Sequence, residues 1–296
     1  GGNQAYYNVS CTSSSVVATI TGANTFNNLS FAGKTAAGLN IAIFSANQTI
    51  NGTLTVSAGS NATMRMFLQS DTIGTTRTLT CAAVSFTDTD FRDITISGAA
   101  APASGTRLGD CKGNSGITFP AGVNKYWNLA AGGNWSAIAW ATTGGGTPAI
   151  NNFPLAQDTA VFQSDVATLS SGSTVTINQP YNIGTVDMSA RTANIMTLSI
   201  PSAGTASIYG NWINGTGTTL TGTGQITFSA RGSQTITSAG ATFTQPITLN
   251  SPSGTLQLQD ALTTSAAVAG AFTLTNGTID LNGKTLTISG TGATFV

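Results

Sequence analysis

The chain has 296 residues, 40% hydrophobic but only 7% charged, and its formal net charge is zero. Charged residues usually make up about 25% of a globular protein, and the acids here are all Asp, with no Glu and no His. So few cations exclude the basic stripe that nucleic-acid binding requires. No apolar run reaches the roughly 20 residues of a membrane-spanning helix. We therefore expect no nucleic-acid partner and no membrane insertion.

The same composition predicts an all-β protein. The lack of Glu and the scarcity of Lys disfavour long helices, whereas abundant Thr, Ser, Gly, Asn, Val and Ile suit strands and tight turns. Disorder is the alternative for a chain rich in Gly, Ser and Thr. The regular alternation of apolar residues, together with 13 Phe and 4 Trp that need burial, argues against disorder.

Residues 1–120 are predicted to form an N-terminal β-rich array. Two of its segments, 25–31 and 48–56, show the apolar and polar alternation of half-buried strands. They resemble segments near the C-terminal end, at 242–249 and 276–288, in pattern and composition. The chain therefore contains two related arrays.

Three cysteines lie in the first array, and an odd number gives no complete disulfide framework. Cys81 and Cys111 could pair with each other, whereas Cys11 would then remain alone. Buried thiols are the preferred interpretation, because unpaired Cys is among the most buried residue types.

Three acids lie close together in the segment 88–93, namely Asp88, Asp90 and Asp93, and Arg92 precedes the last of them. On a strand, Asp88 and Asp90 would share one face and Asp93 would lie on the other. Such a group is typical of a calcium site or of the paired carboxylates of a glycan-cleaving enzyme. The preferred interpretation is that these residues cap turns at a corner and pair with Arg92, since Asp favours turns.

Residues 121–165 are predicted to form an aromatic, Gly-rich connector or cap. Tyr126, Trp127, Trp135 and Trp140 crowd together there, ahead of the glycines at 144–146, without the period of a strand. Indole rings on a surface stack on sugar rings, so this group is a candidate glycan site. A buried cluster is preferred, because aromatic side chains bury large areas.

Residues 166–296 are predicted to form a C-terminal β-solenoid. Short alternating segments recur, separated by turn signals such as Asn276-Gly277 and Asn282-Gly283. Three strands fit into about 20 to 30 residues, which is the scale of one solenoid coil. The apolar residues of these segments would stack into an inner ladder, with Thr and Asn outside. The alternating segments are Ile226–Phe228, Gln234–Ile236, Ile247–Leu249, Leu256–Leu258, Phe272–Leu274, Ile279–Leu281 and Leu286–Ile288.

The aromatic segment carries a resemblance to a known group of proteins. The run Tyr126-Trp127, Gly133-Asn-Trp-Ser136, Trp140, Gly144–Gly146 and Pro154–Asp158 resembles a motif that precedes β-helical repeats in bacteriophage tail-fibre-like and bacterial surface proteins. The stretch 109–119 and the repeats with Asn-Gly-Thr-Ile-Asp-Leu-Asn-Gly-Lys-Thr-Leu-Thr are similar to the same pattern. The resemblance implies a β-helical fold and an extracellular location, on a virion surface or on a bacterial cell surface.

No catalytic residue, cofactor or metal ion is expected. There is no His, the cysteines are far apart in sequence, and the Gly-rich stretches lack the Lys and helix of a phosphate loop. We expect a non-enzymatic, phage tail-fibre-like scaffold for host attachment that begins and ends within a longer protein. The alternatives are a secreted bacterial adhesin and a polysaccharide depolymerase. The expected partners are other virion or surface proteins, with a host-surface glycan and a homotrimer as further candidates.

Overall fold

The computed structural model describes residues 2–12, 17–57 and 59–296 of the chain, and it is nearly all β, with 48% strand and 2% helix. Parallel coils stack into a β-solenoid of about 12 turns, which confirms the predicted fold class. Two short 3-10 turns, Gly98–Ala100 and Ile150–Asn152, supply the helix within the described residues. The chain divides into two compact units, Gly1–Ala121 and Gly122–Val296.

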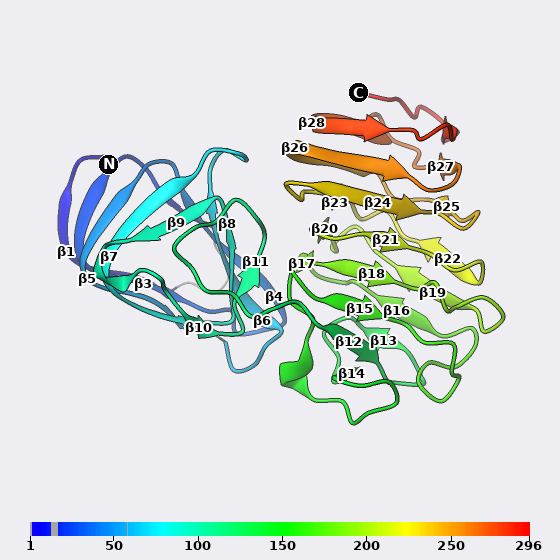
Figure 1. Ribbon diagram of the computed structural model, residues 1–296, viewed down its shortest axis with the longest axis horizontal. Coiled ribbons are helices and arrows are strands. Elements are labelled where there is room, and N and C mark those ends of the chain that lie inside the picture. Colours follow the sequence, from blue (N-terminus) through cyan, green and yellow to red (C-terminus); the bar gives the residue numbers. More distant parts are fainter. Residues whose placement is uncertain (1, 13–16, 58) are drawn as a thin grey trace. The chain divides into compact units, whose positions relative to one another are not determined.

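The first unit is a two-sheet solenoid whose chain alternates between the sheets (Figure 1). One sheet has the order β1-β3-β5-β7, with β9 and β10 both on β7, and the other has the order β11-β8-β6-β4-β2. All described pairs in these sheets are parallel. The strands are β1 Ala5–Cys11, β2 Ala18–Ile20, β3 Asn24–Ala32, β4 Gly38–Phe44, β5 Gln48–Ser57, β6 Met64–Ser70, β7 Arg77–Thr87, β8 Thr89–Arg92, β9 Ile94–Ser97, β10 Gly105–Thr106 and β11 Gly109–Asp110.

The core of the first unit consists of apolar side chains stacked coil upon coil. Phe26 pairs in register with Ile50, and Ile50 with Cys81, so that each buried residue lies above a buried residue of the next coil. Burying such side chains contributes about 1.5–3 kcal/mol each. Cys81 and Cys111 are both buried thiols, in agreement with the preferred interpretation.

The second unit has three strands in each coil, one on each of three sides, and Figure 1 shows these coils stacked on one another. One side consists of β17, β20, β23 and the first half of β26. A second side consists of β12, β15, β18, β21, β24 and the second half of β26. Strand β28 pairs with both halves of β26 and so extends both sides. The third side contains the sheets β13-β16-β19-β22 and β25-β27-β29. The strands are β12 Asn124–Trp127, β13 Gly133–Asn134, β14 Trp140–Ala141, β15 Thr159–Val161, β16 Thr174–Thr176, β17 Tyr181–Ile183, β18 Thr185–Asp187, β19 Met196–Ser199, β20 Ala206–Ile208, β21 Trp212–Ile213, β22 Thr218–Thr221, β23 Ile226–Phe228, β24 Ser233–Thr237, β25 Thr242–Phe243, β26 Ile247–Leu258, β27 Leu262–Thr264, β28 Phe272–Asp280 and β29 Leu286–Ile288.

The coils of the second unit have the length predicted for a solenoid. Tyr181 pairs with Ala206, Ala206 with Ile226, and Ile226 with Ile247, so each coil returns the chain to the same side after a similar stretch of sequence. The predicted segment 121–165 contributes β12 to β15, and β12 continues the second unit's sheet through its parallel pairing with β15. These residues therefore pack as the first coil of that solenoid.

Candidate functional site

The three clustered acids lie on and beside strand β8 of the first solenoid, two of them at its corners. Asp88 connects β7 to β8 and Asp93 connects β8 to β9, and both have left-handed backbones, with φ of 50° and 57°. Asp tolerates this conformation better than most residues do. Asp90 alone lies within a strand, in β8, and all three side chains are buried. The turn position predicted for the three acids thus agrees with the backbone of Asp88 and Asp93, whereas Asp90 lies inside a strand and not at a turn.

Two arginines neutralise Asp88 and Asp90. Arg107 binds Asp88 with two charge-assisted hydrogen bonds, Nε to Oδ1 at 2.5 Å and Nη2 to Oδ2 at 2.7 Å. Arg65 from β6 donates to Asp90 Oδ1 from Nη2 at 2.5 Å, and its Nη1 lies 3.6 Å from Asp88 Oδ1. Arg65 Nη2 also donates to the carbonyl of Arg107, at 3.0 Å. The carboxylates thus hold two arginines together within the fold.

Burial alone lowers the pKa of Arg65, but the hydrogen bond and charge of Asp90, and then the charge of Asp88, outweigh it. The pKa of Arg65 is therefore raised above its ordinary value. Arg65 is not predicted from the sequence as a partner of these acids, because it lies one coil away from them.

Asp93 has separate contacts. Its Oδ2 accepts a hydrogen bond from the backbone N–H of Gly74 at 3.0 Å and lies 3.9 Å from Arg92 Nε. Arg92 also donates to Gln69 and lies over the ring of Phe67, 5.2 Å from its centroid. Arg92 is thus near Asp93, as predicted, but the stronger ion pairs of the acid group involve Arg65 and Arg107. Across residues 2–12, 17–57 and 59–296, no three His, Cys, Asp or Glu side chains gather into a possible metal site.

The structure brings the three predicted tryptophans together around Phe162. Trp127 and Trp140 meet edge to face at 5.1 Å, and Trp135 lies 4.8 Å from Trp140. Each indole is at most 1% exposed, so no ring surface is open for a sugar to stack on. Trp140 Nε1 donates to the carbonyl of Trp135 at 2.8 Å, which fixes the loop between them. Tyr126 is half-buried instead, and its hydroxyl accepts from Asn124 Nδ2 at 3.2 Å.

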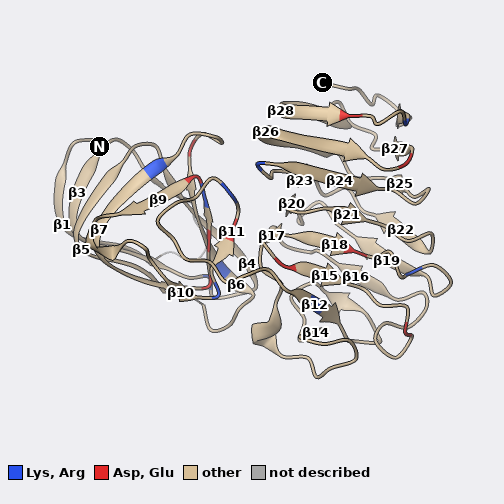
Figure 2. Ribbon diagram, in the orientation of Figure 1, with Lys and Arg blue, Asp and Glu red and all other residues tan. Residues whose placement is uncertain are grey.

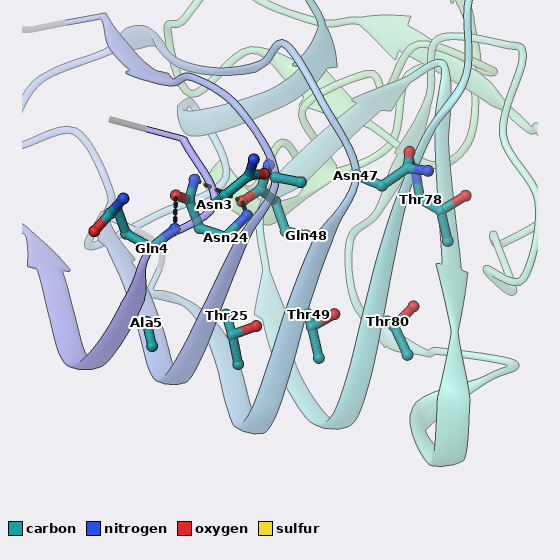
Figure 3. A pocket seen from close by; sticks show the side chains of 11 residues that line it. Asn3, Gln4, Ala5, Asn24, Thr25, Asn47, Gln48, Thr49, Thr78 and Thr80 are labelled. Atoms are coloured by element: carbon teal, nitrogen blue, oxygen red, sulfur yellow. Dashed lines mark hydrogen bonds between the residues drawn. The ribbon is translucent and has the colours of Figure 1, made fainter.

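A polar groove that the sequence analysis did not identify opens on the first unit, at the start of β3, β5 and β7 (Figure 3). Its volume is about 520 Å³. None of its lining residues is charged, and most carry a side-chain amide or hydroxyl. They are Asn3, Gln4, Ala5, Ala23, Asn24, Thr25, Asn47, Gln48, Thr49, Thr78 and Thr80.

Buried amides hold one wall of this groove. Asn24 Oδ1 accepts from the backbone N–H of Gln4 at 3.3 Å, and Gln48 Oε1 accepts from both the backbone N–H and Nδ2 of Asn24 at 3.1 Å. Gln48 Nε2 in turn donates to two backbone carbonyls, those of Gly22 and Ala46, at 2.8 Å. The ladder thereby saturates the amides that would otherwise be costly to bury, and it fixes the wall.

A row of hydroxyls forms the other wall. Thr25 pairs in register with Thr49, and Thr49 with Thr80, and Figure 3 shows their side chains aligned across neighbouring strands. The sequence does carry a signal for this groove. An amide followed by Thr and then a buried apolar residue occurs at Asn24–Phe26 and again at Gln48–Ile50, one coil later.

Charges are sparse on both units, and those of the first unit gather around β6, β8 and β11 (Figure 2). No helix within the described ranges has the length and apolarity needed to cross a membrane. Neither the families with a known sequence model, nor the curated proteins, nor the solved structures include a match to this chain.

Proposed function

We propose that this protein is a non-enzymatic scaffold of a phage virion surface, similar to a tail fibre, that attaches to an uncharged glycan of the host surface. The solenoid itself is a rigid β-scaffold, which suits a structural or adhesive role. The observation that supports attachment is the row of Thr hydroxyls along the groove on the first unit. A neutral sugar offers hydroxyl groups, and Thr side chains both donate to and accept from such groups, while the paired amides of Asn24 and Gln48 hold the opposite wall in place.

An exposed tyrosine lies on the same strand as a residue that lines the groove. Tyr7 is 78% exposed and lies two residues after Ala5, a groove residue, on the edge strand β1. Alternate residues of a strand lie on one face, so the phenol ring is available beside the groove for stacking on a sugar ring.

The contacts of Asp88 and Asp90 support the part of this proposal that describes the protein as non-enzymatic. A glycosidase requires one carboxyl group that holds a proton and a second one nearby that is ionised. Here Arg107 binds Asp88 and Arg65 binds Asp90, and both carboxylates are buried, so neither is open to a sugar ring. We expect the purified protein to release no oligosaccharide from capsule or lipopolysaccharide. Release that is lost in a folded Asp90→Asn variant would contradict this proposal.

Glycan-array binding tests the groove, with neutral and acidic glycans on the same array. We expect binding to neutral glycans that weakens about 2- to 10-fold in Thr49→Val, because one hydrogen bond contributes about 0.5–1.5 kcal/mol. Thr55→Val is the matched control, since Thr55 lies on the same strand but outside the groove. Binding that is equally affected by both variants, or confined to acidic glycans, would overturn the assignment of the groove.

A secreted bacterial adhesin would use the same groove, so the glycan array does not separate the two locations. Immunogold labelling of purified virions and of the host cells does separate them. Label on virion tails supports the phage proposal, whereas label on the bacterial surface alone supports the adhesin.

A further inference from the structure

The third side of the second unit carries two parallel rows of hydroxyl side chains. On each of its strands from β16 to β29, a Thr is followed two residues later by Thr or Ser, with one residue between them that points inward. The first row is Thr174, Thr197, Thr219, Thr242, Thr263 and Thr287. The second row is Thr176, Ser199, Thr221, Thr244, Ser265 and Ser289. We call these positions the hydroxyl array.

Strand pairing keeps each of the two halves of the array, β16 to β22 and β25 to β29, in register. Thr174, Thr197 and Thr219 are direct partners on successive strands, and so are Thr242, Thr263 and Thr287. No register shift interrupts these ladders. The two sheets also meet, because Thr244 Oγ1 donates to the carbonyl of Gly222, which follows β22, at 2.8 Å. Figure 1 shows the strands from β16 to β27 stacked along one side of the unit.

The array is held rigidly from behind. The residues between the two rows include Val175, Leu198, Leu220 and Phe243, each less than 5% exposed, whereas the array positions themselves are exposed or half-buried. Close packing of these inner side chains holds the strand backbone in place. The positions from which the hydroxyls project are therefore set before any ligand arrives, which lowers the entropic cost of binding.

The geometry of stacked strands sets two repeats in the array. Neighbouring strands lie about 4.7–4.9 Å apart, and alternate residues of one strand lie about 6.6 Å apart. A ligand that fits this array is flat and uncharged, and its hydrogen-bonding groups repeat in two directions at distances close to the two spacings of the array. The prism faces of hexagonal ice present water oxygens in such a lattice. Thr suits an ice surface, because its methyl group displaces liquid water while its hydroxyl group forms a hydrogen bond with the ice lattice.

We infer that the hydroxyl array binds ice. A crystalline neutral polysaccharide is also flat and periodic, but sugar-binding surfaces commonly supply aromatic rings for stacking, and each array position is Thr or Ser. No array position carries a charge that would orient water against the lattice. The inference does not depend on the proposed glycan groove, because that groove belongs to the other unit.

The test is partition of the full chain into slowly growing ice, together with inhibition of ice recrystallisation. We expect a much larger fraction of this protein to enter the ice than of an unrelated soluble protein of similar size. Thr219→Tyr places a large ring in the middle of the array and should lower recrystallisation inhibition on the order of tenfold, since a clash rejects a flat ligand. Thr278→Tyr is the control, because Thr278 is equally exposed on β28, in another sheet, and should leave the inhibition unchanged.

Thr219→Val keeps the shape of the side chain and removes its hydroxyl, so it tests the array if the Tyr variant fails to fold. Circular dichroism and thermal melting verify the fold of each variant. Partition into ice no greater than that of the unrelated protein would overturn the inference, as would folded Thr219→Tyr with full inhibition. Binding to crystalline cellulose or chitin that Thr219→Tyr abolishes, without partition into ice, would assign the array to a polysaccharide instead.

Discussion

The two units have the same kind of core but differ in how regular their coils are. In the first unit, Ala5 pairs with Thr25, Asn24 with Gln48, and Gln48 with Leu79, so the stretch of sequence between partners lengthens up to β7, and it shortens again where Arg77 pairs with Ile94. In the second unit, the stretch between partners along one side varies much less from Tyr181 to Phe272. The uneven coils carry the groove and the ionic network, whereas the more even coils carry the regular rows of hydroxyl side chains.

The units also differ in what they bury at their irregular places. The first unit holds an ionic network in which Arg65, Asp88 and Asp90 are buried and Arg107 is half-buried. The second buries an aromatic cluster in its first coil. An ionic network must remain complete because each charge is costly to bury alone. An aromatic cluster depends on contact area and tolerates a missing polar partner, such as the one Trp135 Nε1 lacks.

The largest expected effect comes from breaking the ionic network. Arg65→Met leaves Asp90 buried without its cation, and we expect a loss of about 3–5 kcal/mol in the free energy of unfolding of the first unit. The control is Arg77→Met, whose partner Asp71 lies at the surface and contributes about 0.2–1 kcal/mol.

The measurement exploits the uneven distribution of tryptophan. All four Trp residues lie in the second unit, so their fluorescence follows the unfolding of that unit, while circular dichroism follows both. A urea titration of Arg65→Met should shift the circular dichroism transition alone. Similar midpoints for Arg65→Met and Arg77→Met would show that the network does not stabilise the fold.

Breaking the aromatic cluster should have a comparable effect on the other unit. Trp135→Ala removes a buried indole, and we expect a destabilisation of about 3–5 kcal/mol. The fluorescence of the remaining tryptophans in a urea titration reports it. Ile138→Ala is the control, because Ile138 lies in the same loop but is 61% exposed, and it should change stability by less than about 0.5 kcal/mol. A stable Trp135→Ala that lost glycan binding would instead indicate a sugar site.

A smaller effect should come from the close stacking of the second unit's coils. A Cβ atom at Gly204 would lie 1.8 Å from the backbone oxygen of Ile177, so Gly204→Ala should destabilise by about 1–3 kcal/mol. At Gly232 an added Cβ meets nothing within 4 Å, and Gly232→Ala should be neutral or stabilise by about 0.4–1 kcal/mol. Thermal melting measures both, and equal melting temperatures would contradict the close approach.

The smallest effect concerns thiol chemistry in the first unit. Burial raises the pKa of Cys81 to about 12 and also raises that of Cys11, which is only half-buried. Because the thiolate is the reactive form, iodoacetamide at pH 8 should label Cys11 well before Cys81. Mass spectrometry of timed digests measures the order, and unfolding in urea should remove the difference. Rapid labelling of Cys81 in the folded chain would mean that the core opens locally.

Cys81 also makes stability depend on alkaline pH. Its pKa is higher in the folded than in the unfolded state, so its contribution is complete below about pH 8.5. That contribution should decline as the pH rises towards about 12, since the unfolded chain then loses the thiol proton first. Cys81→Ala should remove this decline from urea titrations at increasing pH. A decline of the same size in Cys81→Ala would assign it to other groups.

The sequence determined much of the architecture by itself. Alternation with a period of two identified β23, β24 and β29 as strands, and the spacing of turn residues indicated coils of solenoid length. Both follow from local chemistry, since alternate residues of a strand lie on opposite faces. The crowding of tryptophans likewise predicted an aromatic cluster, because rings of that size close together in sequence need a shared core.

The tertiary structure decided where strands join. The predicted pairs Ile247–Leu249 with Leu256–Leu258, and Phe272–Leu274 with Ile279–Leu281, merge into the single strands β26 and β28. The turn residues between them have positive φ, 63° at Ser253 and 103° at Gly277, and bend the strands without ending their pairing. A turn signal does not reveal whether the ladder continues beyond it.

The sites were decided by stacking. Arg65 reaches Asp90, Asn24 reaches Gln48, and Thr197 lies beside Thr219, although the partners in each pair are far apart in the sequence. In a solenoid, the neighbour of a residue lies one coil away, and the length of that coil depends on corners that the alternating pattern does not encode. The sequence therefore predicted coils and a core, while the groove, the ionic network and the hydroxyl array arose only when packing fixed the register between coils.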